Sequence, residues 1–318
     1  MDMKITTVST KKLKALRRKK KLSEIVRDRQ LYLMFLPFFV YYIMFYYMPL
    51  YGLQIAFKNY KPILGVSDSQ WVGFTHFMNF FLSPYAWRVI RNTLMINIYD
   101  LIFNFTGTIL MALLLNEIVH KKLRTAIQTV LYMPYFISIV VVAGLVISLL
   151  SPSTGVINLI MSKFGIEKIN FLARQEFFRT IFVSMNMWSG LGFGTIIYTS
   201  AICSIDESLY EAADIDGAGR LKKMWHITLP GIKSTVVVML ILRMGSMMSV
   251  GSDAIILLYQ PITYETADVI SSFVYRYGLE RGDYSYGAAV GLFNSIIALV
   301  LVVASNKISQ KVNETSLW

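Results

Sequence analysis

Residues 31–57 read LYLMFLPFFVYYIMFYYMPLYGLQIAF, a run of 27 positions without a charged side chain. Such a run is long enough to cross, as a helix, a hydrocarbon core of about 30 Å. Five more apolar blocks of 19 to 26 residues follow along the chain: Asn92–Asn116, Thr125–Leu150, Thr180–Cys203, Lys233–Leu258 and Gly287–Ser305. We therefore predict an all-α integral membrane protein with six transmembrane helices, the first being Leu31–Phe57.

The composition agrees with lipid as the main solvent of the chain. Hydrophobic residues make up 55% of the 318 residues and charged residues only 16%, a balance that does not suit a soluble surface. The single cysteine, Cys203, excludes an internal disulfide and a cysteine-based metal cluster. We interpret it as a packing residue at a helix end.

The positions of the basic residues predict the orientation of the spans. Twenty of the 31 Lys and Arg fall in the N-terminal arm, the second loop, the fourth loop with its edge, and the C-terminal tail. These segments share one face of a six-span protein, and the positive-inside rule makes that face cytoplasmic. The net charge of +12 therefore does not indicate nucleic acid as a partner, and both termini are expected in the cytosol.

The prediction divides the chain into a basic cytosolic arm (residues 1–30), a transmembrane domain (31–305) and a cytosolic tail (306–318). The arm carries eleven basic residues among a few apolar ones. It could lie on an anionic inner leaflet as an interfacial helix. We favour the simpler interpretation that a basic run before a first span anchors its orientation.

The longest predicted cytosolic segment between spans, residues 204–232, reads SIDESLYEAADIDGAGRLKKMWHITLPGI. Asp206 can cap a helix over Glu207–Asp214, the glycines that follow permit a sharp turn, and Pro230 closes the segment before the fifth span. A short helix held by two spans suits docking into a groove on another protein. A solvated loop that merely keeps its charges out of the bilayer is the alternative that these features leave open.

This loop resembles the EAA motif of permeases from binding-protein-dependent ABC importers. Glu211-Ala212-Ala213 is followed, at the spacing of that motif, by Gly217, Ile227 and Leu229-Pro230. Other stretches, including YMPYFIS (132–138) and YETADVISSFVYRYGL (264–279), resemble the carbohydrate-uptake permeases and in particular their LplB-like branch for polysaccharides and oligosaccharides. The resemblance covers essentially the whole chain beyond the basic arm.

The resemblance implies a type I ABC importer permease fold and a non-catalytic subunit of an ATP-driven importer for oligo- or polysaccharides. The loop would be the coupling helix, in which Glu211 pairs with a basic group of an ATPase and Gly217 makes the turn. The implied docking set is Glu211, Ala212, Ala213, Asp216, Gly217, Ile227, Leu229 and Pro230. Implied partners are a second, related permease in a heterodimer, two ABC ATPase subunits, an extracellular or lipid-anchored sugar-binding protein, and the lipid of a bacterial cytoplasmic membrane.

We expect no enzymatic site in this chain. It lacks the P-loop pattern G-x-x-x-x-G-K-[ST], so ATP and Mg²⁺ are expected on the partner ATPase and no cofactor or metal on this chain. A membrane glycosyltransferase would need paired carboxylates, and nothing sets two acids apart in any predicted external loop. The alternatives that remain are a stand-alone secondary transporter, which predicts internal repeats that are not evident, and an ABC permease for a non-sugar solute.

Polar residues inside the predicted spans are candidates for a hydrated substrate pathway. In the fifth span, Arg243, Ser246, Val250 and Asp253 fall within an arc of about 80° on one helix face. Arg243 could hold a uronate carboxylate there, but the same groups could equally pair with polar side chains of neighbouring spans such as Asp100, Asn104, Asn186 or Asn294. The candidate pathway set is Asn186, Trp188, Arg243, Ser246, Asp253 and Asn294.

Overall fold

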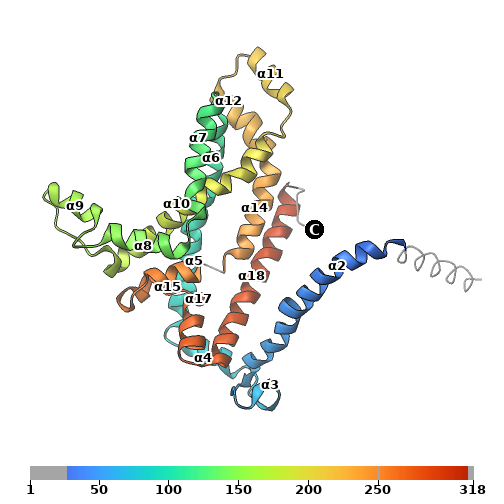
Figure 1. The fold of residues 1–318 in the computed structure, drawn as a ribbon, viewed down its shortest axis with the longest axis vertical. Coiled ribbons are helices and arrows are strands. Elements are labelled where there is room, and N and C mark those ends of the chain that lie inside the picture. Colours follow the sequence, from blue (N-terminus) through green and yellow to red (C-terminus); the bar gives the residue numbers. More distant parts are fainter. Residues whose placement is uncertain (1–26, 249–250, 314–318) are drawn as a thin grey trace, which may run out of the picture. The chain divides into compact units, whose positions relative to one another are not determined.

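The computed structural model describes residues 27–248 and 251–313 (Figure 1). The chain divides into two compact units, residues 1–54 and residues 55–318. Most of the predicted basic arm (1–26), the end of the predicted tail (314–318) and Val250 lie outside the described residues.

The first unit contributes one apolar helix. Helix α2 (Arg29–Tyr42) continues through a π-helical turn, η1 (Ile43–Tyr47), into the 3₁₀ segment η2 (Met48–Phe57), whose last three residues belong to the second unit. No residue from 27 to 54 is buried in the structure, although the segment consists largely of big apolar side chains. A helix that is apolar all round and exposes every face suits lipid as its surroundings.

The second unit begins with a two-stranded hairpin and a short helix. Strand β1 (Lys58–Asn59) pairs antiparallel with β2 (Gln70–Trp71), with Lys58 opposite Trp71. The short helix α3 (Gly65–Asp68) lies between the two strands in the sequence. Helix α4 (Thr75–Leu82) follows.

The rest of the second unit is helical. Up to the central helix the elements are α5 (Ala86–Asp100), η3 (Leu101–Phe105), α6 (Thr106–Asn116), α7 (Lys121–Tyr132), η4 (Met133–Phe136), α8 (Ile139–Leu150), α9 (Val156–Lys163), η5 (Phe171–Ala173) and α10 (Gln175–Ile202). After it come α11 (Glu207–Ile215), α12 (Arg220–Lys223), η6 (Met224–Thr228), α13 (Leu229–Gly231), α14 (Lys233–Ser246), α15 (Ser252–Leu258), η7 (Pro261–Thr263), α16 (Tyr264–Ala267), α17 (Ile270–Val274), η8 (Tyr275–Glu280) and α18 (Tyr284–Asn313).

Four helices in the described ranges are long and apolar enough to cross a membrane. They are Arg29–Phe57, Ala86–Asn116, Gln175–Ile202 and Tyr284–Lys311. Two further pairs of helices pass the same test together but are sharply bent, so the number of candidate spans is six when each pair is counted as one. Each of the six overlaps one of the apolar blocks predicted from the sequence.

The predicted third span, Thr125–Leu150, is not one continuous helix. The segment Lys121–Phe136 meets Ile139–Leu150 at a bend of 98°. Pro134 lacks a backbone N–H, and Ile137 and Ser138 after it adopt extended backbone conformations. The expectation of an uninterrupted helix was wrong here because a run of apolar residues does not reveal where the chain turns.

The predicted fifth span, Lys233–Leu258, is also interrupted. Helix α14 ends at Ser246 and α15 begins at Ser252, with the poor helix former Gly251 immediately before it. The segment Arg220–Gly231 in turn meets α14 at a bend of 59°. The continuous fifth helix was therefore a wrong expectation, and the single polar face drawn through it does not exist as one helix face.

Helix α10 forms the centre of the second unit. It packs against α5, α6, α7, α8, α14 and α15, and its buried aromatic residues Phe178 and Phe182 belong to the largest apolar cluster. At Gly192 a Cβ atom would lie 2.0 Å from the backbone oxygen of Leu131, so only glycine allows this approach of α10 to α7.

Several loops of the second unit lie at two opposite ends, whereas α9 projects to one side (Figure 1). Helices α11 and α12 lie at one, which we call the α11 end. Helices α4 and α17 lie at the other, which we call the α4 end, and here the start of α5 contacts α16 and α17. The predicted second and fourth loops thus lie on the side of the α11 end, opposite to the first and fifth loops.

Candidate functional site

One exposed helical loop of the second unit is built on α11. Asp206 caps this helix, because its Oδ1 accepts the backbone N–H of Ser208 at 3.0 Å. That hydrogen bond stabilises the carboxylate and lowers the pKa of Asp206. The cap predicted from the sequence is present, and α11 runs over Glu207–Ile215.

A glycine turn ends α11. The backbone N–H of Ala218 donates to the carbonyl of Ala213 at 2.8 Å, and that of Gly217 donates to Asp214 at 3.1 Å, the two bonds of a Schellman motif. Gly217 has a φ of +72°, a conformation that residues with a Cβ rarely adopt. The chain then reverses into α12.

Two side-chain contacts join α11 to the helical segment that follows the turn. The ammonium of Lys223 lies 2.7 Å from Asp214, and the hydroxyls of Tyr210 and Thr228 are 2.9 Å apart. Thr228 is buried, so the second contact ties α11 to the base of the loop. The loop is therefore an ordered helix–turn–helix and not merely a solvated connection.

The same loop exposes large apolar side chains. Leu209, Ile215, Leu221 and Trp225 keep between 52% and 88% of their surface accessible. Sequence reasoning missed this group, although apolar residues in a loop expected to lie in water were a usable signal. Exposed apolar surface rimmed by charged residues is typical of a protein–protein contact site.

The residues of the predicted docking set are distributed over the whole loop. Glu211 and Ala212 are exposed on α11, and Asp216 and Gly217 are exposed at the turn. Ala213, Ile227 and Leu229 are half-buried, and Pro230 is exposed. The structure thus leaves the carboxylate of Glu211 accessible to a partner.

The candidate pathway residues separate into three cavities. Asn186, Arg243 and Ser246 line a small polar cavity of about 90 Å³ together with Asn97 and Asp100. Asp253 and Asn294 line another of about 550 Å³ between α8, α15, α17 and α18. Trp188 lines a third, largely apolar one of about 410 Å³ between α8 and α10.

Arg243 forms an ion pair with Asp100 of α5. Asp100 is buried and also accepts a hydrogen bond from Asn104 at 3.3 Å. Of the two interpretations that the sequence left open for Arg243, this geometry favours a contact between helices. The pair still lines the small polar cavity, so its charges lie beside any solute that enters it.

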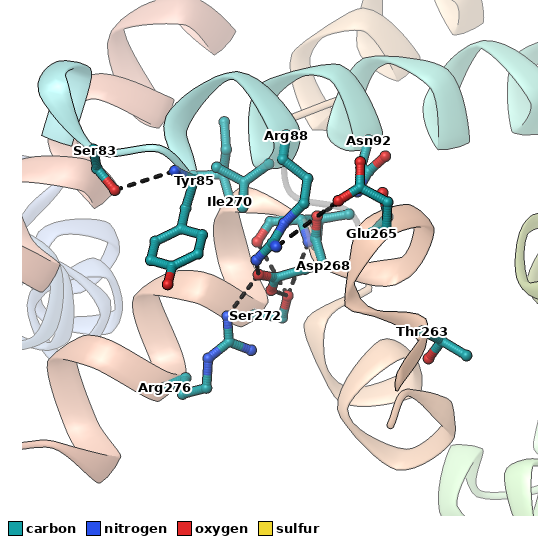
Figure 2. A network of polar contacts seen from close by, with 12 residues as sticks. Ser83, Tyr85, Arg88, Asn92, Thr263, Glu265, Asp268, Ile270, Ser272 and Arg276 are labelled. Carbon is teal, nitrogen blue, oxygen red and sulfur yellow. Dashed lines mark hydrogen bonds and ion pairs between the residues drawn. The ribbon is translucent and has the colours of Figure 1, made fainter. Parts of the chain in front are cut away.

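A buried ionic network lies at the α4 end (Figure 2). The carboxylate of Asp268 has no exposed surface and receives Arg88 at 3.1 Å, Arg276 at 2.5 Å and the Ser272 hydroxyl at 2.9 Å. Burial by itself would lower the pKa of Arg276, but the hydrogen bond and the negative charge of Asp268 outweigh it and raise that pKa. Sequence reasoning did not single out Asp268 because its partners lie up to 180 positions away.

Within the described residues, no cluster of His, Cys, Asp and Glu is placed to hold a metal ion. Three other features are candidates for a functional role: the helical loop with its exposed apolar face, the polar cavity between spans, and the ionic network at the α4 end. Together with the candidate spans they describe a multi-span membrane protein that exposes large apolar side chains at the α11 end.

Comparison with known proteins identifies the family. The model of the family described as binding-protein-dependent transport system inner membrane component matches residues 104–314. The chain is 42% identical to Protein LplB of Bacillus subtilis, with 93% of each protein covered. It is 41% identical to the polygalacturonan/rhamnogalacturonan transport system permease protein YteP of the same species, over 95% of this chain and 94% of that protein.

A solved structure agrees with these relatives. A chain of a bacterial alginate ABC transporter, crystallised with an alginate pentasaccharide-bound periplasmic protein, superposes with a TM-score of 0.86 at 45% identity. The comparison covers 93% of this chain and 99% of that one. The chain belongs to the family of inner membrane components of binding-protein-dependent transport systems, which confirms the predicted ABC permease family and the all-α membrane fold.

Proposed function

We propose that this chain is a permease subunit of an ATP-driven importer for oligo- or polysaccharides and that the α11 loop is its coupling element. The observation that carries the docking role is the braced loop with four exposed apolar side chains beside the accessible carboxylate of Glu211. The sugar substrate is supported by the relatives, which include the permease protein of a polygalacturonan/rhamnogalacturonan transport system and a chain of an alginate ABC transporter.

In this proposal the loop seats in a groove of an ATPase subunit. The exposed apolar residues leave water on docking, and Glu211 pairs with a basic group of that subunit. The ATPase holds ATP and Mg²⁺, and this chain binds no cofactor. Rigid-body movement of the loop then tilts the spans between two states, because four residues connect α11 to α10 and the helical segment Arg220–Gly231 leads from the loop into α14.

The remaining partners follow from the same assignment. A second, related permease completes the pathway, two ATPases serve the two coupling loops, and a sugar-binding protein docks at the α4 end. The α11 end faces the cytosol in this arrangement, since it carries the predicted loops rich in Lys and Arg. Both termini then lie in the cytosol.

The first test is affinity purification of the tagged chain from its own membrane in mild detergent, with mass spectrometry of what stays bound. We expect a P-loop ATPase and a second permease with the wild type, and loss of the ATPase alone with Glu211→Arg. Glu280→Arg, an equal charge reversal at the α4 end, is the control and should retain both. Recovery of the chain alone from wild-type membranes contradicts the importer and favours a stand-alone carrier.

The orientation has its own test because Cys203 is the single cysteine and is exposed just beyond α10. A membrane-impermeant maleimide should label it in inside-out vesicles and leave it unlabelled in intact cells. A matched variant, Cys203→Ser with Ser67→Cys, moves the thiol to an exposed position in the first loop and should reverse the result. Labelling of Cys203 in intact cells would reverse the proposed topology.

A further inference from the structure

A pocket at the α4 end has no part in the docking loop or in the candidate pathway set. It has a volume of about 380 Å³, within the range of about 300–1,000 Å³ that small-molecule sites occupy. Its lining comes from three predicted external segments: Tyr85 and Arg88 near the start of α5, Gln175 at the start of α10, and residues between 261 and 281. The segments are tied together, because Gln175 donates to the carbonyl of Ile262 at 2.8 Å.

Stacked arginine–tyrosine pairs form much of this pocket. The guanidinium carbon lies 4.9 Å from the ring centroid for Arg88 on Tyr85, 4.2 Å for Arg276 on Tyr264, and 4.1 Å for Arg281 on Tyr277. A stacked guanidinium is held in one plane while the N–H groups at its edge stay able to donate. Aromatic faces beside such donors suit a ring-shaped ligand that carries acceptors.

The charges of the lining leave an excess of positive charge. Asp268, buried behind the pocket, is shared by Arg88 and Arg276. Glu265, which lines the pocket, pairs with Arg91 at 3.0 Å and with Arg88 at 4.0 Å. Among the residues that the structure describes, no carboxylate pairs with Arg281. Arg281 is exposed, so its guanidinium can donate two hydrogen bonds to the carboxylate of a ligand.

We infer that this pocket binds a sugar unit bearing a carboxylate, a uronate, at the mouth of the permease. The inference rests on the proposed sugar import and narrows its substrate to anionic sugars. The guanidinium of Arg281 holds the carboxylate, and the other arginines and the tyrosines of the lining contact the rest of the sugar unit. Asp268 is a positioning residue, because it fixes Arg88 and Arg276 and does not itself line the pocket.

The test measures binding in the absence of any sugar-binding protein. The full chain, with the subunits that co-purify, is placed in lipid nanodiscs and titrated with trigalacturonate and with its fully methyl-esterified, uncharged counterpart by saturation-transfer difference NMR. We expect trigalacturonate to bind the wild type about tenfold more tightly than the ester, the size of one charge-assisted hydrogen-bonded contact. Arg281→Gln should remove that preference, and Arg281→Lys should keep part of it.

The control is Arg174→Gln, which removes an exposed arginine that pairs with Glu176 outside the pocket and should leave the preference intact. Equal affinity of the wild type for the two trimers, no binding of either, or an equal loss of both in Arg281→Gln would overturn the inference. Uptake of a neutral oligosaccharide by the intact importer, measured in parallel, separates the two claims. If the importer takes up the neutral oligosaccharide but the chain does not prefer trigalacturonate, only the proposed function stands. If the chain binds trigalacturonate through Arg281 but takes up no sugar, only the inference about the pocket stands.

Discussion

At the α11 end four large apolar side chains lie in the open, whereas at the α4 end a carboxylate without exposed surface lies between two guanidinium groups. Exposed apolar surface is unfavourable in water, and its burial against a partner lowers the free energy of the system. A buried charge is costly unless a counter-charge lies beside it, and for Asp268 the same chain supplies that counter-charge. The apolar side chains of the α11 end thus stay open in this chain, as at a protein–protein contact site, whereas the Asp268 network is complete within it.

We therefore expect the Asp268 network to contribute to folding stability and the α11 loop to contribute to partner binding. The network joins α5, α16 and η8 through Asp268, and the backbone amide of Ile270 adds a bond to the hydroxyl of Thr93 at 2.9 Å. The α11 loop makes two side-chain braces and keeps its apolar residues outside the core. Variants of the network should change unfolding, and variants of the loop surface should change what binds.

The largest effect is expected from Asp268→Asn. The amide keeps the shape of the side chain but leaves Arg276 without a counter-charge and Arg88 with only Glu265 at 4.0 Å, and breaking a buried ion pair in this way costs about 3–5 kcal/mol. The apparent unfolding temperature of the purified protein in detergent should fall sharply. The yield of folded protein should fall with it.

Glu265→Gln is the matched control. Glu265 keeps 52% of its side chain exposed, pairs with the half-exposed Arg91 and lies 4.0 Å from Arg88, which keeps Asp268 in this variant. The change should therefore cost less than about 1 kcal/mol. Equal unfolding temperatures for the two variants would show that the network does not stabilise the α4 end.

The second effect concerns association. Trp225→Ala removes the largest exposed side chain of the loop, which is 64% accessible and makes little internal packing. Its unfolding temperature should stay unchanged. Retention of the ATPase during purification should weaken by about 2 kcal/mol, or roughly thirtyfold, if Trp225 is an anchor of the interface.

Trp87→Ala is the control for Trp225→Ala. Trp87 is 72% exposed at the start of α5, at the α4 end, and its removal should leave ATPase retention intact. The same loss of ATPase in both variants would mean that retention does not depend on the face presented by the α11 loop.

The sequence predicted what depends on local pattern. Apolar runs indicated where spans lie, and Asp206, Gly217 and Pro230 indicated a capped helix, a turn and an end. The resemblance of the loop to a known motif indicated the family, which the comparisons confirmed.

The sequence did not predict what depends on distant contacts. The pairing of Asp268 with Arg88 joins positions 180 apart, and the pairing of Arg243 with Asp100 was one possibility among several. Apolar runs also hide breaks, because the 98° bend after Pro134 and the interruption before Gly251 leave the hydropathy of their blocks high. The break in the fifth span accompanies the separation of Asp253 from Arg243 and Ser246, which line different cavities.

The smallest effect tests the turn that orients the loop. In Gly217→Ala the new methyl group meets no atom within 4 Å, so its cost arises only from the φ of +72° and should be about 1–2 kcal/mol. That cost falls on the local unfolding of α11, and hydrogen exchange of the α11 amides should quicken accordingly. Gly219→Ala is the control, because Gly219 has a φ of −69° and equally open surroundings, so exchange should stay the same or slow slightly. Equal exchange in the two variants would mean that the left-handed turn does not hold α11, and the order of the loop would then have to come from the Tyr210–Thr228 and Lys223–Asp214 contacts alone.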